Sequence, residues 1–316
     1  MLVWAYFNLL PGDYKQLGTH VAGALTFTSN LVFYSKSGYF DSASHLKWLL
    51  HTWSLSVEWQ FYLLYPLLIM ALLKAVGGRS GRLAIVALMC LSFALATWLS
   101  YRAQSFAYFM LPSRAWEMLI GGVVYLYPLE LRGRNKAVLA LTGLGLIILS
   151  LFVLDSTTPW PGQWALLSVA GTCLVIVAGY TGTWPTTNRL VAWLGKTSYS
   201  THLWHWPVCV YLYKHGLSDQ PWAIVGCIAL SFGLGSASYW TVEQSSKRRA
   251  AAVGTLGRWH SKTRRPLAIS TFFLVVVSGY TIAKSNGAHY RIADEIKALS
   301  AITNVYEYFD LKQNIR

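Results

Sequence analysis

The sequence predicts an all-α polytopic integral membrane protein with about eight full membrane spans, and three observations support this fold class. Of the 316 residues, 54% are hydrophobic and 12% are charged, which is too apolar for a soluble domain of this length. The apolar residues form blocks of roughly 20, the length of a helix that crosses the hydrocarbon core. Basic residues gather in alternate loops between these blocks, as the positive-inside rule requires of a multi-pass protein.

The expected spans follow one another through most of the chain. They lie near residues 53–73, 83–100, 113–127, 137–154, 164–180, 197–213, 222–242 and 267–283. Two earlier stretches are not assigned as full spans. Residues 1–10 are too few to cross the bilayer, and residues 17–34 are interrupted by Thr and Ser, so we expect them to lie in the interface or to re-enter the membrane.

The basic residues predict an orientation. Loops rich in Lys and Arg lie at 74–82, 132–136, 189–196 and 247–265. The loops that alternate with them carry only Arg102 and Lys214, so the rich loops are expected in the cytoplasm and the tail outside. This asymmetry accounts for the net charge of +14 without a nucleic-acid partner. The last basic loop is interpreted as a solvated segment near anionic lipid or, alternatively, as a site for the phosphates of a cytoplasmic donor.

The cysteines and histidines predict no metal site. Cys90, Cys173, Cys209 and Cys227 are scattered through apolar spans without a C-x-x-C pair, so we interpret them as small core residues rather than a disulfide framework. The histidines lack a set of partners at metal-ligand spacing. No bound cofactor is expected.

The first strong functional signal is Glu58, which opens a long apolar run. A carboxylate in hydrocarbon costs roughly 2.5–3.5 kcal/mol on insertion scales, so we expect it to face the protein interior and to have a task. Ser54 and His51 precede it by four and seven residues, on the same face if the helix extends that far. A polar stripe on one side of a membrane helix indicates a site rather than an anchor.

Two further groups could carry chemistry. Arg114 and Glu117 are spaced i, i+3 and can pair, either as a structural helix-end ion pair or as part of a site. Ser198, His202 and His205 fall on one face of a later span, flanked by tryptophans. His205 is the stronger candidate for a functional role, and the alternative is a satisfied structural histidine.

The predicted orientation brings these groups to similar depth. Glu58 and the pair Arg114–Glu117 fall in the outer halves of their helices, and His205 falls near the middle of the membrane. We therefore expect one polar cavity that opens outward. In it a carboxylate, a histidine and an arginine could bind a hydroxyl acceptor and stabilise charge on an acyl group.

These motifs, in this order, resemble the acyltransferase-3 family of integral-membrane O-acyltransferases, which includes O-acetylases of lipopolysaccharide O-antigen and of peptidoglycan. The matching stretches are residues 9–11, 27–30, 38–41, 51–66, 111–122 and 198–208. The resemblance implies an enzyme of the bacterial inner membrane. It implies that acetyl-CoA on the cytoplasmic side gives an acyl group, usually acetyl, to a sugar hydroxyl of an envelope polysaccharide.

The resemblance also assigns residues by position. Those expected to act in catalysis are Glu58, Arg114, Glu117 and His205. Those expected to bind substrate are His51, Trp53, Ser54, Tyr199, His202 and Trp204. The chain departs from the family pattern at two of these places. Trp59 follows Glu58 where the family has a second acid, and His202 replaces a tyrosine.

The resemblance further implies that the family's first helices, with a histidine and an arginine-rich motif, precede Met1. Residues 1–284 are therefore expected to form a membrane acyltransferase domain that is incomplete at its N-terminus and inactive alone. Residues 285–316 would form a short external tail in place of an esterase-like domain. Two alternatives stay open: a proton-coupled transporter or flippase-like protein, and a non-catalytic remnant. A transporter predicts paired repeats and broken helices, which the sequence does not show.

Overall fold

The computed structural model describes residues 1–37, 46–129, 131–155, 157–180, 187–245, 261–288 and 290. Every element in these residues is a helix, and none of them lies in a strand, so the predicted all-α class is confirmed for the described chain. The resembled stretch 38–41, the basic segment 247–260 and most of the predicted tail 285–316 lie outside these residues.

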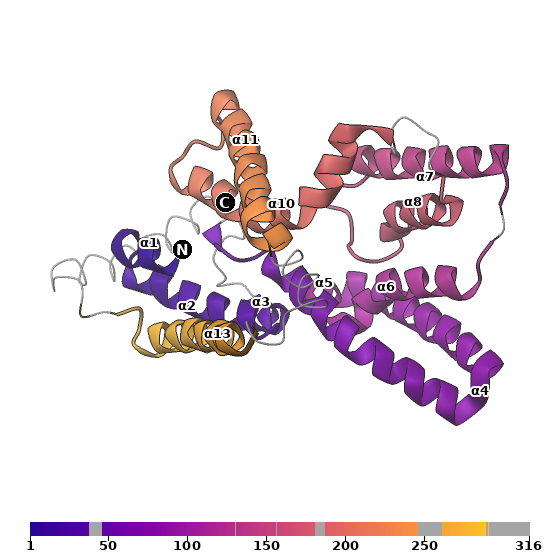
Figure 1. Cartoon of the computed structure of the whole chain (residues 1–316), viewed down its shortest axis with the longest axis horizontal. Helices are drawn as coiled ribbons and strands as arrows, with labels where there is room; N and C mark the ends of the chain where they lie inside the picture. Colours follow the sequence, from indigo (N-terminus) through magenta and orange to yellow (C-terminus); the bar gives the residue numbers. More distant parts are fainter. Residues whose placement is uncertain are drawn as a thin grey trace.

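The helices follow in the order shown in Figure 1. They are α1 (Leu2–Asn8), α2 (Pro11–Leu25), α3 (Ser29–Lys36), α4 (Thr52–Arg102), α5 (Gln104–Phe109), α6 (Leu111–Leu126), α7 (Arg134–Val153), α8 (Ala165–Ala178), α10 (Arg189–Lys214), α11 (Pro221–Ser238), the π-helical turn η2 (Tyr239–Glu243) and α13 (Ser261–Lys284).

The long element α4 consists of two helices joined at Gly77. The backbone there has φ 79° and ψ 174°, a conformation that glycine adopts at little cost because it has no Cβ. Figure 1 shows the two arms folding back beside each other, so they correspond to the first two predicted spans. Lys74, Arg79 and Arg82 lie around the bend. Phe61 from the first arm and Ile85 from the second are buried against each other and against α6.

Local sequence sets several helix boundaries. Pro11 begins α2 and Pro221 begins α11, and Pro112 lies in the first turn of α6. Proline suits these positions because the first N–H groups of a helix have no intrahelical partner. At the start of α10 the side chain of Asn188 accepts hydrogen bonds from the backbone N–H groups of the following turn, which caps the helix.

Glycine allows close contact within two of the helix pairs. Gly143 of α7 and Gly171 of α8 face each other, and a Cβ built on either would lie within 3 Å of the other's carbonyl oxygen. Gly18 of α2 and Gly279 of α13 meet in the same way. Membrane helices often associate through such small residues, because lipid offers no hydrophobic force between them.

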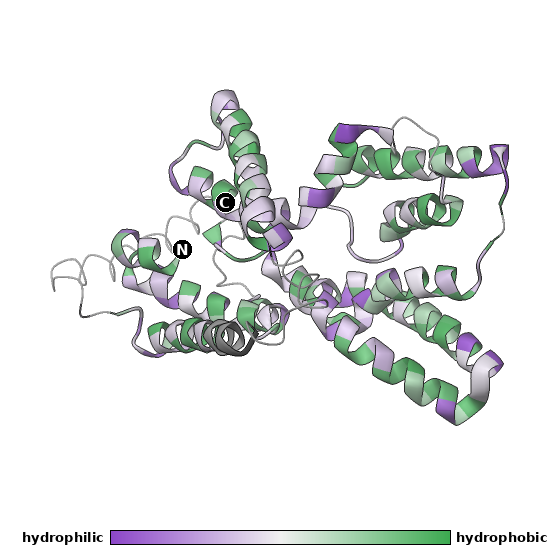
Figure 2. Ribbon diagram, in the orientation of Figure 1, coloured by the Kyte–Doolittle hydropathy of each residue, from purple (hydrophilic) through white to green (hydrophobic). Residues whose placement is uncertain are grey.

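The structure supports membrane insertion for part of the predicted span set. Within the described residues, the helices long and apolar enough to cross a bilayer are Thr52–Arg102, Arg134–Val153 and Pro221–Glu243. The apolar helix α8 is shorter. Figure 2 shows hydrophobic residues along α7 and α8 and hydrophilic residues near the bend of α4. The count of eight spans stays a prediction.

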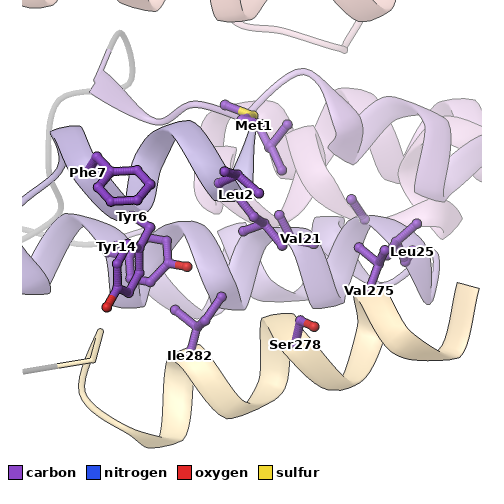
Figure 3. A pocket seen from close by; sticks show the side chains of 13 residues that line it. Met1, Leu2, Tyr6, Phe7, Tyr14, Val21, Leu25, Val275, Ser278 and Ile282 are labelled. Atoms are coloured by element: carbon purple, nitrogen blue, oxygen red, sulfur yellow. The ribbon is translucent and has the colours of Figure 1, made fainter. Parts of the chain in front are cut away.

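The N-terminal part is broken into short helices. The predicted interfacial or re-entrant stretch 17–34 falls on α2 and α3, with Phe27 at a positive φ of 54° between them. An apolar pocket of about 830 Å³ lies between α1, α2 and α13, and Tyr6, Val21 and Ile282 are among its lining residues (Figure 3). Because its lining is almost wholly hydrophobic, this pocket supplies few groups for chemistry.

Candidate functional site

Three histidines meet in the structure, one from the start of α4 and two from α10. His51 immediately precedes α4, and His202 and His205 lie one turn apart on α10. The ring centroid of His51 is 5.4 Å from that of His202 and 5.8 Å from that of His205. The rings of His202 and His205 are 5.1 Å apart. We call these three side chains the histidine cluster.

One hydrogen bond determines which ring nitrogen of His205 carries the proton. Its Nδ1 lies 2.6 Å from the carbonyl oxygen of His202. A carbonyl oxygen can only accept, so Nδ1 must carry the proton and donate it. In the neutral ring Nε2 is then left with a lone pair, and His205 can accept a proton there.

His51 is held in its neutral form. It is buried, and its Nδ1 finds no hydrogen-bond partner in the described part of the chain. Burial, followed by the electrostatic influence of His202 and His205, lowers the pKa of His51 to about 3. Near neutral pH the ring therefore contributes no charge to the cluster.

A network of side chains holds the start of α4 against α3 and α10. The hydroxyls of Ser29 and Ser56 lie 3.0 Å apart, and Thr52 Oγ1 donates to Ser29 Oγ at 3.1 Å. Trp206 Nε1 donates to the carbonyl oxygen of Lys47 at 2.7 Å. Since Trp206 follows His205 and Lys47 precedes His51, this last bond ties the two sides of the cluster together.

Glu58 does not face the protein interior as expected. The first arm of α4 packs through Trp53, Val57 and Phe61, and Glu58 lies on a different face and is exposed. It makes no hydrogen bond or ion pair with any residue that the structure describes. Its carboxylate interacts electrostatically with Tyr199 of α10. Ser54, one turn earlier, donates to the carbonyl oxygen of His51 at 3.0 Å.

On α10, the predicted residues on either side of the cluster are accessible. Tyr199 is exposed and interacts electrostatically with Glu243 as well as with Glu58. The neighbouring Ser200 donates a hydrogen bond of 3.3 Å to Glu243. Trp204 is exposed and lines an apolar pocket of about 560 Å³ together with Trp48.

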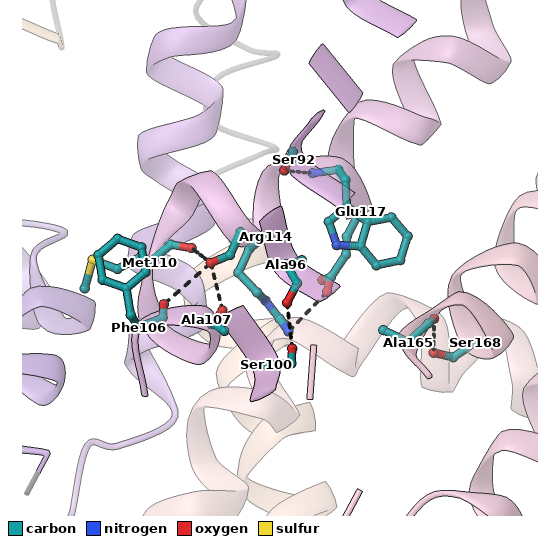
Figure 4. Close-up of polar contacts among 12 residues, drawn as sticks. Ser92, Ala96, Ser100, Phe106, Ala107, Met110, Arg114, Glu117, Ala165 and Ser168 are labelled. Carbon is teal, nitrogen blue, oxygen red and sulfur yellow. Dashed lines mark hydrogen bonds and ion pairs between the residues drawn. The ribbon is translucent and has the colours of Figure 1, made fainter. Parts of the chain in front are cut away.

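The predicted i, i+3 ion pair is present. Arg114 Nη1 lies 3.1 Å from Glu117 Oε1 on α6, and both side chains are mostly buried (Figure 4). The Arg114 guanidinium stacks over Trp53, 5.3 Å from the ring centroid. Trp53 itself is buried and also contacts Tyr108. The sequence predicts that Trp53 binds substrate. In the structure its buried ring packs instead against the Arg114 guanidinium.

Serine side chains position the start of α6. Ser92 Oγ donates to the carbonyl oxygen of Pro112 at 2.6 Å and accepts from the backbone N–H of Trp116 at 3.0 Å. Ser113 Oγ donates to carbonyl oxygens in the segment before the helix (Figure 4). Ser113 thereby satisfies a carbonyl oxygen at the end of α5, and Ser92 ties the second arm of α4 to the turn that carries Arg114.

The structure thus places the predicted residues in two neighbouring groups. The histidine cluster lies where α4 meets α10, and the ion pair lies on α6. Trp53, two residues after His51, links them. The pocket lined by Trp204 and the pocket lined by Glu117 have no residue in common. The single outward cavity stays a prediction.

Sequence reasoning missed a polar contact that joins three segments. Gln60 Nε2 donates to Asn30 Oδ1 at 2.8 Å and to the carbonyl oxygen of Phe27 at 2.9 Å. Asn30 Nδ2 donates to the carbonyl oxygen of Phe109 at 3.1 Å. The available signal was Gln60 itself, an amide side chain in an otherwise apolar run.

Comparison with known proteins identifies the family of this chain. The chain matches the model of the acyltransferase-3 family, described as an acyltransferase domain, over residues 1–241. It is 30% identical over 260 residues to a provisionally named membrane-bound transacylase, BcsY of Komagataeibacter xylinus, covering 78% of the chain and 62% of that protein.

A second relative carries a more specific name. The chain is 25% identical over 246 residues to a provisionally named peptidoglycan O-acetyltransferase, YrhL of Bacillus subtilis (strain 168). That match covers 70% of the chain and 38% of the relative. The chain therefore spans less than two thirds of the length of either relative. No solved structure matches it significantly.

Proposed function

The chain belongs to the acyltransferase-3 family, and on this premise we propose that it moves an acyl group, acetyl in the first instance, from a cytoplasmic thioester donor to a hydroxyl of a cell-envelope polysaccharide. The observation that carries the proposal is the extent of the family match. Residues 1–241 include every candidate residue, and among them the histidine cluster supplies a proton acceptor.

The proposed chemistry begins at His205. Its Nε2 lone pair takes the proton of the acceptor hydroxyl while the hydroxyl oxygen attacks the carbonyl carbon of the thioester. A carbon–oxygen bond forms, the carbon–sulfur bond breaks, and the leaving thiolate takes the proton from His205. The ring then returns to its neutral form. His51 and His202 surround His205 and limit its movement.

Arg114 is proposed to stabilise the negative charge that develops on the carbonyl oxygen. A fixed guanidinium in a site that excludes water stabilises such charge more strongly than solvent does. Glu117 and Trp53 hold this guanidinium in place by the ion pair and by stacking. Glu58, exposed and near Tyr199, is proposed to accept a hydrogen bond from the acceptor and to orient it.

The proposed location is the bacterial inner membrane, with the basic loops in the cytoplasm. The basic residues around the Gly77 bend lie at the end of the α4 arms away from His51, which supports placing the histidine cluster toward the outer side. Ser200 and Tyr199, within one turn of His202 on the side toward the start of α10, are proposed to offer polar contacts for the acyl end of the donor.

The proposed acceptor is an envelope glycan. The name of YrhL points to peptidoglycan for that protein, and we extend this class of acceptor to the chain. Lipopolysaccharide is the other acceptor to test.

The test is acetylation in cells. The chain, with any in-frame coding sequence that precedes Met1 in its gene, is expressed in a bacterium that lacks its own O-acetylase, and acetyl esters on peptidoglycan and lipopolysaccharide are measured by mass spectrometry. We expect acetyl esters that an empty vector does not give. Glu58→Gln, which keeps the size of the side chain but removes its charge, should abolish them without lowering the membrane level of the protein. Absence of new esters on both glycans contradicts the proposal.

A further inference from the structure

A small pocket with a mostly apolar wall and a few oxygen-bearing side chains lies beside the ion pair, between α6 and α8. Its volume is about 190 Å³. Helix α6 contributes Glu117 and Gly121, and helix α8 contributes Ser168, Thr172, Cys173 and Ile176. Figure 4 shows Glu117 and Ser168 on the two helices. None of the residues from α8 belongs to the candidate site described above.

The charges at this pocket cancel. The Glu117 carboxylate is paired with Arg114 at 3.1 Å, and the other side chains that line the pocket are uncharged. A cation would be repelled by Arg114, and an anion would be repelled by Glu117. A neutral ligand therefore suits the pocket best.

The hydrogen-bonding groups of the pocket are acceptors. Ser168 Oγ donates its proton to the carbonyl oxygen of Ala165 at 3.1 Å, and Thr172 Oγ1 donates its proton to the carbonyl oxygen of Ser168 at 2.9 Å. Each hydroxyl oxygen keeps lone pairs, and the carboxylate of Glu117 accepts only. A ligand that complements the pocket must be a hydrogen-bond donor, and hydroxyl groups are the neutral donors that fit three oxygen acceptors.

The volume limits the ligand to one ring. At about 30 Å³ for each water, a pocket of about 190 Å³ corresponds to roughly six water molecules. This is smaller than the roughly 300–1,000 Å³ of pockets that enclose drug-sized ligands. A single sugar ring or one hydroxylated arm is of the appropriate size, and an oligosaccharide is not.

We propose that the pocket formed by Glu117, Ser168 and Thr172 is a binding subsite for one hydroxyl-bearing sugar residue of the acceptor glycan. The inference rests on the proposed function, because it assigns the subsite to the acceptor. The ion pair thereby has two contacts: Arg114 faces Trp53, and Glu117 faces the sugar.

Cys173 provides a direct test of binding, because its thiol lies in the pocket wall. The native chain in membrane vesicles is treated with N-ethylmaleimide, and the modification rate of each cysteine is followed by peptide mass spectrometry. N-acetylglucosamine and glucose serve as probes. Their fully O- and N-methylated derivatives are matched controls, since they keep the ring but have no hydrogen-bond donor. Cys90, exposed on α4, is the internal reference.

We expect either sugar to slow the modification of Cys173 several-fold, with no effect of the methylated derivatives and no change at Cys90. The proposal is overturned if neither sugar slows the reaction or if the methylated derivatives slow it equally. It is also overturned if Cys173 does not react even without sugar, because the pocket would then be closed.

Kinetics give a second test. Thr172→Val removes the acceptor oxygen but keeps the shape of the side chain, and it should raise the acceptor KM about 3- to 10-fold while the donor KM stays constant. Thr172→Ser should restore most of the affinity. An unchanged acceptor KM in Thr172→Val contradicts the subsite. Protection of Cys173 in a protein that transfers no acyl group would support the subsite and contradict the proposed function. Acyl transfer without protection would do the reverse.

Discussion

The Nδ1 of His205 donates a hydrogen bond of 2.6 Å to the carbonyl oxygen of His202, one turn earlier on α10. This bond lies entirely within one helix, so it does not depend on how α10 packs against its neighbours. It determines which ring nitrogen is free to react.

The bond leads to a prediction for His205→Asn. The asparagine amide can reproduce the donor at Nδ1 but has no counterpart of Nε2. Transfer of acetyl should therefore fall by about 10²- to 10⁴-fold, the usual contribution of a general base, while the amount of folded protein stays constant. Acetyl esters on glycan and the membrane level of the protein are measured together.

The control is His215→Asn, because His215 lies just past the end of the same helix and its Nδ1 lies 2.8 Å from the carbonyl oxygen of Tyr211. This variant should transfer normally. Equal activity of the two variants would show that His205 has no special role in proton transfer.

A second prediction concerns pH and His51. Its pKa is lowered from 6.5 to about 3, so the unfolded chain gains a proton on this residue as the pH falls below 6.5 whereas the folded chain does not. The stability that comes from neutral His51 is fully present above pH 6.5 and is lost as the pH falls toward 3. Between about pH 7.5 and about pH 5.5 the free energy of unfolding should drop by about 1 kcal/mol from this residue.

Thermal unfolding of the detergent-solubilised protein at the two pH values measures the drop. His51→Gln cannot titrate, so it should show a smaller decrease in Tm on acidification than the unsubstituted chain. His215→Gln, at an exposed position, should show the full decrease. If all three proteins respond alike, His51 does not control the acid sensitivity.

A third prediction tests the shape of Arg114. Lysine keeps the positive charge but has no plane to stack on Trp53 and cannot present several donors in a fixed fork. Arg114→Lys should lower acetyl transfer by about 10²- to 10³-fold, the size of effect seen when one preorganised donor is removed from an oxyanion site. Arg102→Lys makes the same exchange at an exposed helix end and should leave transfer unchanged. Full activity in Arg114→Lys would mean that charge alone suffices there.

A fourth prediction tests the close helix contact of α7 and α8. A Cβ on Gly143 would lie 2.6 Å from the carbonyl oxygen of Gly171, so Gly143→Ala forces the two helices apart. Overpacking of this kind should destabilise the protein by about 1–3 kcal/mol. Gly145→Ala lies on the same helix with nothing within 4 Å of the added Cβ, and it should be neutral or slightly stabilising. Equal Tm values for the two variants would contradict the packing.

The features that could be predicted from the sequence are those set by local spacing. Apolar blocks marked the two arms of α4, and the i, i+3 spacing of Arg114 and Glu117 indicated their ion pair, because both depend on one helix alone. The meeting of His51 with α10 could not be predicted in this way. It depends on contacts between distant segments, such as the bond from Trp206 to Lys47, that no periodicity encodes.

The wrong expectation for Glu58 has a similar cause. The sequence predicts that the polar stripe faces the protein interior, because a carboxylate exposed to lipid hydrocarbon is costly. The larger apolar side chains of Trp53, Val57 and Phe61 instead determine which face of the arm packs, and they leave Glu58 exposed. A helical wheel shows which residues share a face, but it does not show which face is covered by neighbouring helices.

The bend at Gly77 has a consequence for topology mapping. Because the chain reverses there, the two ends of α4 return to the same side, and the bend itself lies at the opposite side. A reporter enzyme inserted after Gly78 and one inserted at Ala103 should therefore give opposite signals for cytoplasmic and external location. Because the histidine cluster lies at the end of α4 away from the bend, the two reporter signals together show on which side of the membrane the cluster lies.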